Sequence, residues 1–325
     1  MRNIHAGKSI RRLAVGIIAL GAFLVPAPLA TASGADRDGR SPVITLPGAT
    51  GAEGIAAAGG STFFAGDLLN GNIFRGDIDE GKAKLFIEAP AGRAAVGMKV
   101  DRDNDLLFVA GGATGQAYVY DLETKKTVQV YDLAPAGASF INDVTLTRDG
   151  AWFTNSRAGE LYRIPVSRDG TPGDIRTLAL DAPAGTVDEG FNLNGIAAAD
   201  DGGTLIVGHF GRGALYAVDP DDGSNKAIDV TDSSGAPVTV TNVDGIVIRD
   251  NTLWAVQNFL NQVSRIDLNG SLGQGEVQEV ITSPYFDIPT TAALFGDTLA
   301  LVNAKFTTPA ATSFEAVLVR ACSGG

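Results

Sequence analysis

A unit of about fifty residues recurs six times along this chain. Each unit opens with a small apolar run, passes a polar turn, enters a second strand-like run, crosses a Gly- or Asn-rich loop and continues into a third run. Successive openings are 43, 46, 52, 50 and 46 residues apart and begin at Glu53, Val96, Asn142, Asn194, Asp244 and Thr290. A repeat of this length with about four strands per unit is the signature of a β-propeller. The sequence therefore predicts an all-β, six-bladed β-propeller over residues 42–325.

The local patterns agree with an all-β fold. Short β-branched or alternating runs such as Leu106–Val109 are separated by Gly, Asp and Asn turns, and no segment after residue 32 keeps a helical period. Pro42–Pro47 precedes the first opening and reads as an additional strand. We expect it to complete the last blade and close the ring.

The N-terminus has the three parts of a secretory signal peptide. Met1–Arg12 carries four positive charges and no acid, Leu13–Leu24 is apolar, and Ala30–Ala32 is a small-residue cleavage site. Twelve apolar residues are too few for a membrane anchor, which needs about 20. We expect cleavage after residue 32, a flexible segment over 33–41 and a secreted protein, by either the general or the twin-arginine route.

Charge limits the classes of partner. Removing residues 1–32 lowers the formal net charge from −12 to −16. Such acidity argues against nucleic acid, which needs a basic face, and disfavours anionic lipid surfaces. It suits calcium and a neutral or cationic small molecule. We expect a monomer that acts on a small-molecule substrate and has no membrane span once the signal peptide is removed.

Cysteine and histidine are too scarce for several kinds of site. Cys322 is the only cysteine, so no internal disulfide and no zinc–thiolate or iron–sulfur site is expected. His209 is the only histidine after residue 32, which excludes histidine-cluster metal sites and mechanisms that need two imidazoles.

The opening positions favour a divalent cation. The first strand of every propeller blade lines the central channel, so residues at the same position in each blade point at one axis. Four of the six openings are oxygen donors, namely Glu53, Asn142, Asn194 and Asp244. Two carboxylates side by side in a channel disfavour each other's ionisation, and a divalent cation removes that cost. Oxygen-only ligands suit calcium, or another divalent cation such as magnesium. The alternative is that Asn-Gly and Asp-Gly are ordinary turn pairs.

At these residues the chain resembles the senescence marker protein/gluconolactonase family, which includes regucalcin and bacterial lactonases. The motifs that carry the resemblance are Ala52-Glu53-Gly54, Ile141-Asn142-Asp143, Asn194-Gly195-Ile196 and Val243-Asp244-Gly245. The resemblance implies that Glu53, Asn142, Asn194 and Asp244 ligate one catalytic metal on the axis. It also implies that Asp244 is the base or nucleophile.

Other residues are candidates for substrate binding. Phe140 stands two residues before Asn142, where regucalcin-like lactonases carry an arginine, so a less polar substrate than a sugar lactone is expected. Loops between second and third strands should open on the metal face, and they offer Arg157, His209, Asn258 and Lys305. In addition, Lys99 is expected to line the channel or pair with a channel carboxylate.

The reaction class that fits this set is hydrolysis of a lactone or related ester. The sequence leaves two alternatives open. One is a secreted, non-catalytic binding propeller whose calcium ion only braces the ring, and the other is lyase or strictosidine-synthase-like chemistry on the same fold.

Overall fold

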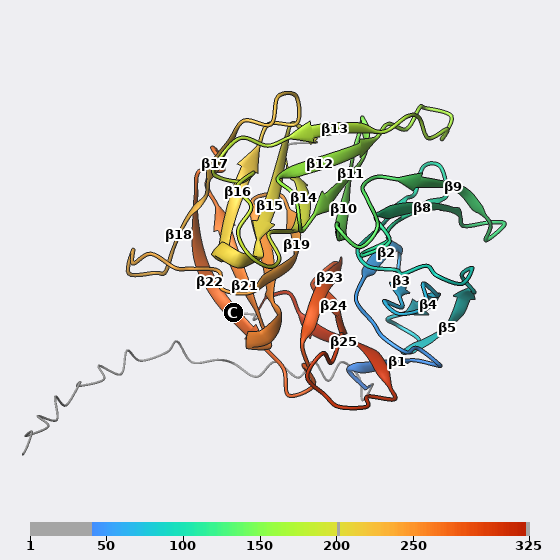
Figure 1. Cartoon of the computed structure of the whole chain (residues 1–325). Helices are drawn as coiled ribbons and strands as arrows, with labels where there is room; N and C mark the ends of the chain where they lie inside the picture. The colour runs from blue at the N-terminus through green and yellow to red at the C-terminus, as the bar shows by residue number, and fades with distance from the viewer. Residues whose placement is uncertain (1–40, 200–201, 323–325) are drawn as a thin grey trace, which may run out of the picture.

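Six twisted sheets are arranged in a ring in the computed structural model of the protein, which describes residues 41–199 and 202–322 (Figure 1). The predicted signal peptide (1–32) and all but the last residue of the predicted segment 33–41 lie outside the described residues. No described helix is long and apolar enough to cross a membrane.

Each sheet is one blade, and its strands follow one another outward from the axis. The first blade comprises β2 (Ile55–Gly59), β3 (Thr62–Gly66), β4 (Ile73–Asp77) and β5 (Lys82–Ile87). The second comprises β6 (Met98–Asp101), β7 (Leu106–Ala110), β8 (Gln116–Asp121) and β9 (Thr127–Asp132). The third comprises β10 (Ile141–Thr147), β11 (Gly150–Asn155), β12 (Glu160–Ile164) and β13 (Arg176–Ala179).

The remaining blades vary this plan. The fourth comprises β14 (Leu193–Ala199), β15 (Thr204–His209), β16 (Ala214–Val218) and β17 (Asn225–Ala227). The fifth comprises β19 (Val243–Arg249), β20 (Thr252–Gln257), β21 (Gln262–Leu268) and β22 (Gln274–Thr282), with β18 (Asp229–Thr231) added in parallel to β22. The sixth comprises β23 (Pro289–Phe295), β24 (Thr298–Asn303), β25 (Phe314–Arg320) and β1 (Val43–Leu46). Two single-turn 3₁₀ helices, η2 (Phe210–Arg212) and η3 (Asn258–Leu260), form part of the loops after β15 and β20.

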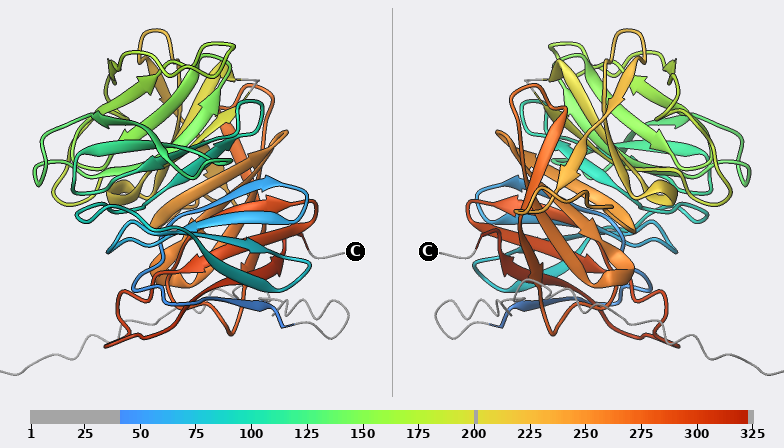
Figure 2. Two further views of the ribbon diagram at one scale, coloured as in Figure 1. Left: turned by 90° about the vertical axis from the view of Figure 1, so that its right-hand side faces the viewer. Right: turned by 90° about the vertical axis from the view of Figure 1, so that its left-hand side faces the viewer.

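The ring is closed by the two ends of the propeller. β1 pairs antiparallel with β25, so the blue start and the red end of the described chain meet in one sheet (Figures 1 and 2). This confirms the prediction that Pro42–Pro47 supplies the last strand of the last blade.

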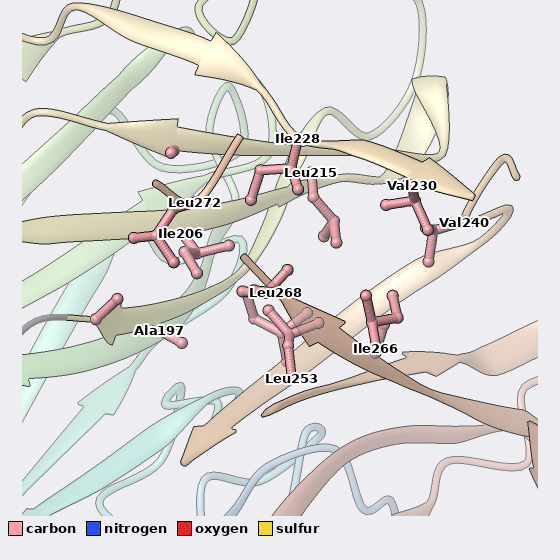
Figure 3. Close-up of a cluster of buried hydrophobic side chains, with 14 of the residues drawn as sticks. Ala197, Ile206, Leu215, Ile228, Val230, Val240, Leu253, Ile266, Leu268 and Leu272 are labelled. Atoms are coloured by element: carbon pink, nitrogen blue, oxygen red, sulfur yellow. The ribbon is translucent and has the colours of Figure 1, made fainter. Parts of the chain in front are cut away.

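Packing between blades supplies the core. Alternate side chains of neighbouring sheets meet in apolar clusters, and Figure 3 shows the cluster between the fourth and fifth blades, where Ile206 and Leu215 face Leu253 and Ile266. Because strands bury both faces between two neighbours, their central residues are apolar on both sides, as in Leu106–Ala110. The six-bladed propeller predicted from the repeat is therefore confirmed.

Candidate metal centre

The six openings come together at one end of the central channel. Each innermost strand contacts the next in the order β2, β6, β10, β14, β19 and β23, and β23 returns to β2. Hydrogen bonds join neighbouring openings: the Gly97 N–H donates to the carbonyl oxygen of Asn142 at 2.8 Å, and Thr290 Oγ1 donates to the carbonyl oxygen of Glu53 at 2.7 Å. Residues at the predicted register therefore do lie around one axis.

A break in the strand ladder sets the direction of the opening side chains. In four blades, the pairing of the first strand with the second skips two residues, which are Asn142-Asp143, Asn194-Gly195, Asp244-Gly245 and Thr290-Thr291. A bulge of this kind bends the strand and re-aims a side chain. Three of the four predicted ligands thus stand at a bulge.

The glycines after the openings serve close packing between blades. A Cβ at Gly54 would lie 1.9 Å from the carbonyl oxygen of Val96, and one at Gly195 would lie 2.3 Å from the carbonyl oxygen of Asp244. Neither glycine has a positive φ, so these Asn-Gly and Glu-Gly pairs are not tight turns. The turn-former explanation of the motifs is wrong for them, because the backbone of the next blade occupies the space of a side chain.

Two buried carboxylates face each other's charge at this end. Glu53 and Asp244 are 7 % and 5 % exposed. Burial raises the pKa of both, and the Asp244 charge raises the pKa of Glu53 further. Asp244 Oδ2 accepts a hydrogen bond from Asn258 Nδ2 at 2.5 Å, and Asn194 also donates to this carboxylate. The pair is costly to ionise without a cation beside it.

The two amides are placed with their nitrogens engaged. Asn142 Nδ2 donates to Ser156 Oγ at 2.9 Å, and Ser156 Oγ donates in turn to the carbonyl oxygen of Leu193 at 2.6 Å. Asn194 Oδ1 is buried and has no hydrogen-bond partner among the described residues. An unpaired buried acceptor is expensive, and together with two buried carboxylates it fits the oxygen ligands that calcium takes.

Asp143 is a buried carboxylate that was not among the site residues predicted from the sequence. It is 6 % exposed, its Oδ1 accepts from the Val144 N–H at 2.8 Å, and its Oδ2 accepts from the Ile196 N–H at 3.2 Å in the next blade. Burial raises its pKa, and the nearby charge of Lys99 opposes that rise. Pairing of Lys99 with a channel carboxylate stays a prediction. The sequence does distinguish this residue. The position after the opening is glycine in four blades and Thr291 in the last, but in the third blade it is an aspartate, Asp143.

The residues expected to bind substrate differ in burial and in the groups that they contact. Asn258 contacts a predicted ligand, because its Nδ2 donates to Asp244 Oδ2, and half-buried Phe140 packs edge-to-face on Phe191 with ring centroids 5.1 Å apart. Arg157 is exposed in the loop between β11 and β12. Contact of these residues with substrate stays a prediction.

His209 and Lys305 have partners within the fold. His209 is the last residue of β15 rather than part of a loop, because it pairs with Leu193, and it is completely buried. Its Nε2 lies 3.1 Å from the carbonyl oxygen of Thr186, and burial lowers its pKa. Lys305 Nζ forms an ion pair with Glu315 at 2.8 Å. Both side chains thus stabilise loops, and their roles toward substrate stay predictions.

A metal centre at this position would depend on the amides. Among residues 41–199 and 202–322, no three or more His, Cys, Asp and Glu side chains group together in a way that would hold a metal ion. A cation at the axis would therefore need Asn142 and Asn194 as well as Glu53 and Asp244.

A cavity of about 1370 Å³ opens at the opposite end of the channel. It is lined by the turns that follow the inner strands, and its charged residues include Asp101, Arg102, Asp103, Arg148, Arg168 and Asp250. Of the predicted site residues, none lines this cavity.

Solved structures with the same fold include proteins of different kinds. The calcium-binding protein regucalcin from Agrobacterium tumefaciens is 15% identical, with a TM-score of 0.57, over 86% of this chain and 97% of that chain. The major allergen Mala s 1 of Malassezia sympodialis is 16% identical, with a TM-score of 0.59, over 80% and 89%. Virginiamycin B lyase from Staphylococcus aureus is 16% identical, with a TM-score of 0.54, over 79% and 76%. At these identities the likeness shows the fold alone.

Sequence comparison gives the family. A search of curated proteins finds no significant match. Residues 52–301, however, match the model of the SMP-30/gluconolactonase/LRE-like region, and this match spans most of the propeller and all four predicted ligands. The chain therefore belongs to the SMP-30/gluconolactonase/LRE-like family.

Proposed function

We propose that this protein is a secreted, divalent-metal-dependent hydrolase of a lactone or related ester, and that calcium is its metal. The observation that carries the proposal is that Asn194 Oδ1, near the buried Glu53 and Asp244 carboxylates, has no hydrogen-bond partner in the described part of the chain. Family membership supports the same reaction class. Secretion rests on the charge and apolar pattern of residues 1–32.

Glu53, Asn142, Asn194 and Asp244 would hold the ion. When bound, a divalent cation polarises a carbonyl oxygen and lowers the pKa of water. The chain's own contribution is to fix the ligands: Ser156 orients the Asn142 amide, and Asn258 orients the Asp244 carboxylate.

Asp244 is the proposed base or nucleophile. Asn258 donates to Oδ2 and Asn194 also donates to this carboxylate, so two amides hold it in place for proton transfer. As a base, Asp244 takes a proton from water while the water oxygen bonds to the substrate carbonyl carbon. The ring C–O bond then breaks and the proton passes to the departing alkoxide, which leaves a hydroxy acid.

The proposal is tested by chelation. Thermal unfolding and hydrolysis of a lactone panel are measured with EDTA and with added calcium, on the wild type, on Asn194→Ala and on Asn251→Ala, an exposed asparagine at the opposite mouth. We expect calcium to raise the unfolding temperature and support hydrolysis in the wild type and Asn251→Ala, and Asn194→Ala to need more calcium for both. If EDTA changes neither property, the metal centre does not exist.

A non-catalytic binding propeller is the second candidate. It is favoured by the exposed apolar side chains around the metal face, such as Phe259 and Phe306. Calcium-dependent stability without hydrolysis of any lactone or ester would select this candidate over the hydrolase.

A further inference from the structure

Exposed apolar side chains gather on the face where the six openings meet. Loops on this face connect second to third strands and outer strands to the next blade. Of the nine large hydrophobic residues that are exposed among the described residues, seven lie in these loops: Leu69, Val187, Phe191, Phe259, Leu260, Tyr285 and Phe306. The other two, Leu85 and Val128, lie on outer-edge strands. Isolated exposed apolar residues need no explanation, but their concentration on one face does.

Aromatic pairs join separate loops of this face. Phe140, before the third blade, meets Phe191, before the fourth, edge-to-face at 5.1 Å. Phe210 and Phe259, in the loops after β15 and β20, meet at 6.4 Å. Such contacts hold rings in defined positions. The rings are therefore part of a built surface rather than loose loop side chains.

Phe140 brings this apolar surface to the ring of openings. Its ring is half-buried against the cluster that contains Val96, the one fully apolar opening. Its backbone is fixed on both sides, because the Phe140 N–H donates to Asn155 Oδ1 at 3.1 Å and its carbonyl accepts from the Ser156 N–H at 2.9 Å. Phe140 is also two residues before Asn142 in the chain, so the apolar surface begins close to that predicted ligand in sequence.

Cations on this face are mostly committed to other groups. Four lysine and arginine residues lie in its described loops. Arg93 donates to Tyr120 and Thr127, Arg212 is paired with Asp188 at 2.6 Å, and Lys305 is paired with Glu315 at 2.8 Å. The fourth, Arg157, is exposed. Recognition of a multiply charged substrate is therefore poorly supported, whereas apolar contact is available.

We propose that the substrate carries a hydrocarbon chain, and that Phe140 and Phe191 determine specificity by packing against it. This inference rests on the proposed hydrolase function and specifies its substrate class: an alkyl-substituted lactone or an ester with an alkyl or acyl chain. The polar head reaches the Asn142, Asn194 and Asp244 side chains, and the chain lies along the aromatic pair.

The test is a homologous series of γ-lactones, from the unsubstituted ring to the pentyl-substituted ring, with calcium present. Burying a methylene contributes about 0.8 kcal/mol, so kcat/KM should rise about 2- to 4-fold with each added methylene. Phe191→Ala should flatten this rise. Phe140→Leu, which keeps an apolar side chain in the partly buried position, should flatten it less than Phe191→Ala. Leu85→Ala, on the outer edge, is the matched control and should keep the wild-type slope.

Binding is measured separately with 3-alkylcyclopentanones, in which a methylene replaces the ring oxygen of the lactones, so that they are not hydrolysed. Calorimetry should show a dissociation constant that falls with chain length in the wild type and less so in Phe191→Ala. A flat or falling kcat/KM series, with lactones still hydrolysed, would overturn the inference and leave the hydrolase standing. Chain-length-dependent ketone binding with no hydrolysis would instead reject the hydrolase and retain the hydrocarbon-binding surface.

Discussion

The two mouths of the central channel differ in how their carboxylates are buried and paired. The mouth with the cavity of about 1370 Å³ is lined by exposed charges, and carboxylates such as Asp101 are satisfied by their own turns, here by the N–H groups of Asp103 and Asn104. At the other mouth, Glu53 and Asp244 are buried and Asn194 Oδ1 has no partner among the described residues.

That difference shows which property marks a site. Exposed carboxylates that accept bonds from their own turn cost little and do not require a ligand. Buried, mutually repelling carboxylates beside an unpaired amide oxygen carry a cost that a bound cation relieves. Cavity volume by itself would select the end of this propeller that lies opposite the predicted ligands.

The largest expected effect is on catalysis, and it is tested by one isosteric substitution at each mouth. Asp244→Asn removes a negative charge and the proposed base, so kcat/KM for a hydrolysed lactone should fall by about 10²–10⁴-fold. Asp250→Asn, at the exposed mouth, should change kcat/KM by less than about twofold, because its carboxylate is solvated. Steady-state kinetics at saturating calcium measure both, and equal losses in the two variants would contradict the comparison.

Packing between blades supplies the second contrast. A Cβ at Gly195 would lie 2.3 Å from the Asp244 carbonyl oxygen, whereas a Cβ at Gly270, on the opposite face, would meet nothing within 4 Å. Gly195→Ala should therefore cost about 1–3 kcal/mol of unfolding free energy, as overpacking does. Gly270→Ala should be nearly neutral. Urea denaturation measures both, and a neutral Gly195→Ala would mean that neighbouring openings do not pack this closely.

The repeat predicted the fold and the convergence of the openings because both follow from register. Once Glu53, Asn142, Asn194 and Asp244 occupy the same position in their units, ring closure places them together. The β1–β25 pairing could be predicted for the same reason, since a ring with one strand missing needs a partner for its last edge.

Side-chain pairing could not be predicted from the sequence because it depends on distances across loops and blades. Lys305 and Glu315 meet only because the chain between β24 and β25 folds back. Asp143 accepts a hydrogen bond from the Ile196 N–H, which lies 53 residues away in the next blade. His209 was predicted to lie in a loop, but it pairs with Leu193 in a strand and is buried there. The sequence names donors and acceptors but not which of them the fold brings together.

The third prediction concerns pH. Burial raises the pKa of Glu53 and Asp244, so the folded, chelated protein prefers their neutral forms and the unfolded chain releases those protons. Stability in EDTA should therefore be greatest in mild acid. It should fall as the pH rises from the ordinary carboxyl range through the raised pKa values.

Calcium should reverse this slope, because it binds the ionised carboxylates. Urea midpoints between pH 5 and pH 8, with EDTA and with calcium, test the sign. Glu53→Gln should flatten the EDTA profile, and Asp101→Asn, at the exposed mouth, should leave it unchanged. A chelated wild type whose stability rises with pH over this range would show that the two carboxylates are not buried together.

The smallest expected effect belongs to His209, which is buried on the metal face but is not a predicted ligand. Burial lowers its pKa below the ordinary value of 6.5, so the folded protein holds the neutral ring. Its contribution to stability is complete above pH 6.5 and is lost as the pH falls below that value toward the lowered pKa.

In calcium-saturated protein, acidification from pH 7.5 to 5.5 should therefore lower the unfolding free energy of the wild type by under about 1 kcal/mol more than that of His209→Gln. Glutamine can still donate to the Thr186 carbonyl oxygen but does not titrate, so a difference between the two slopes isolates ring protonation from the loss of that bond. Parallel slopes would show that the imidazole is hydrated in solution, and that the Glu53–Asp244 pair alone makes this mouth sensitive to pH.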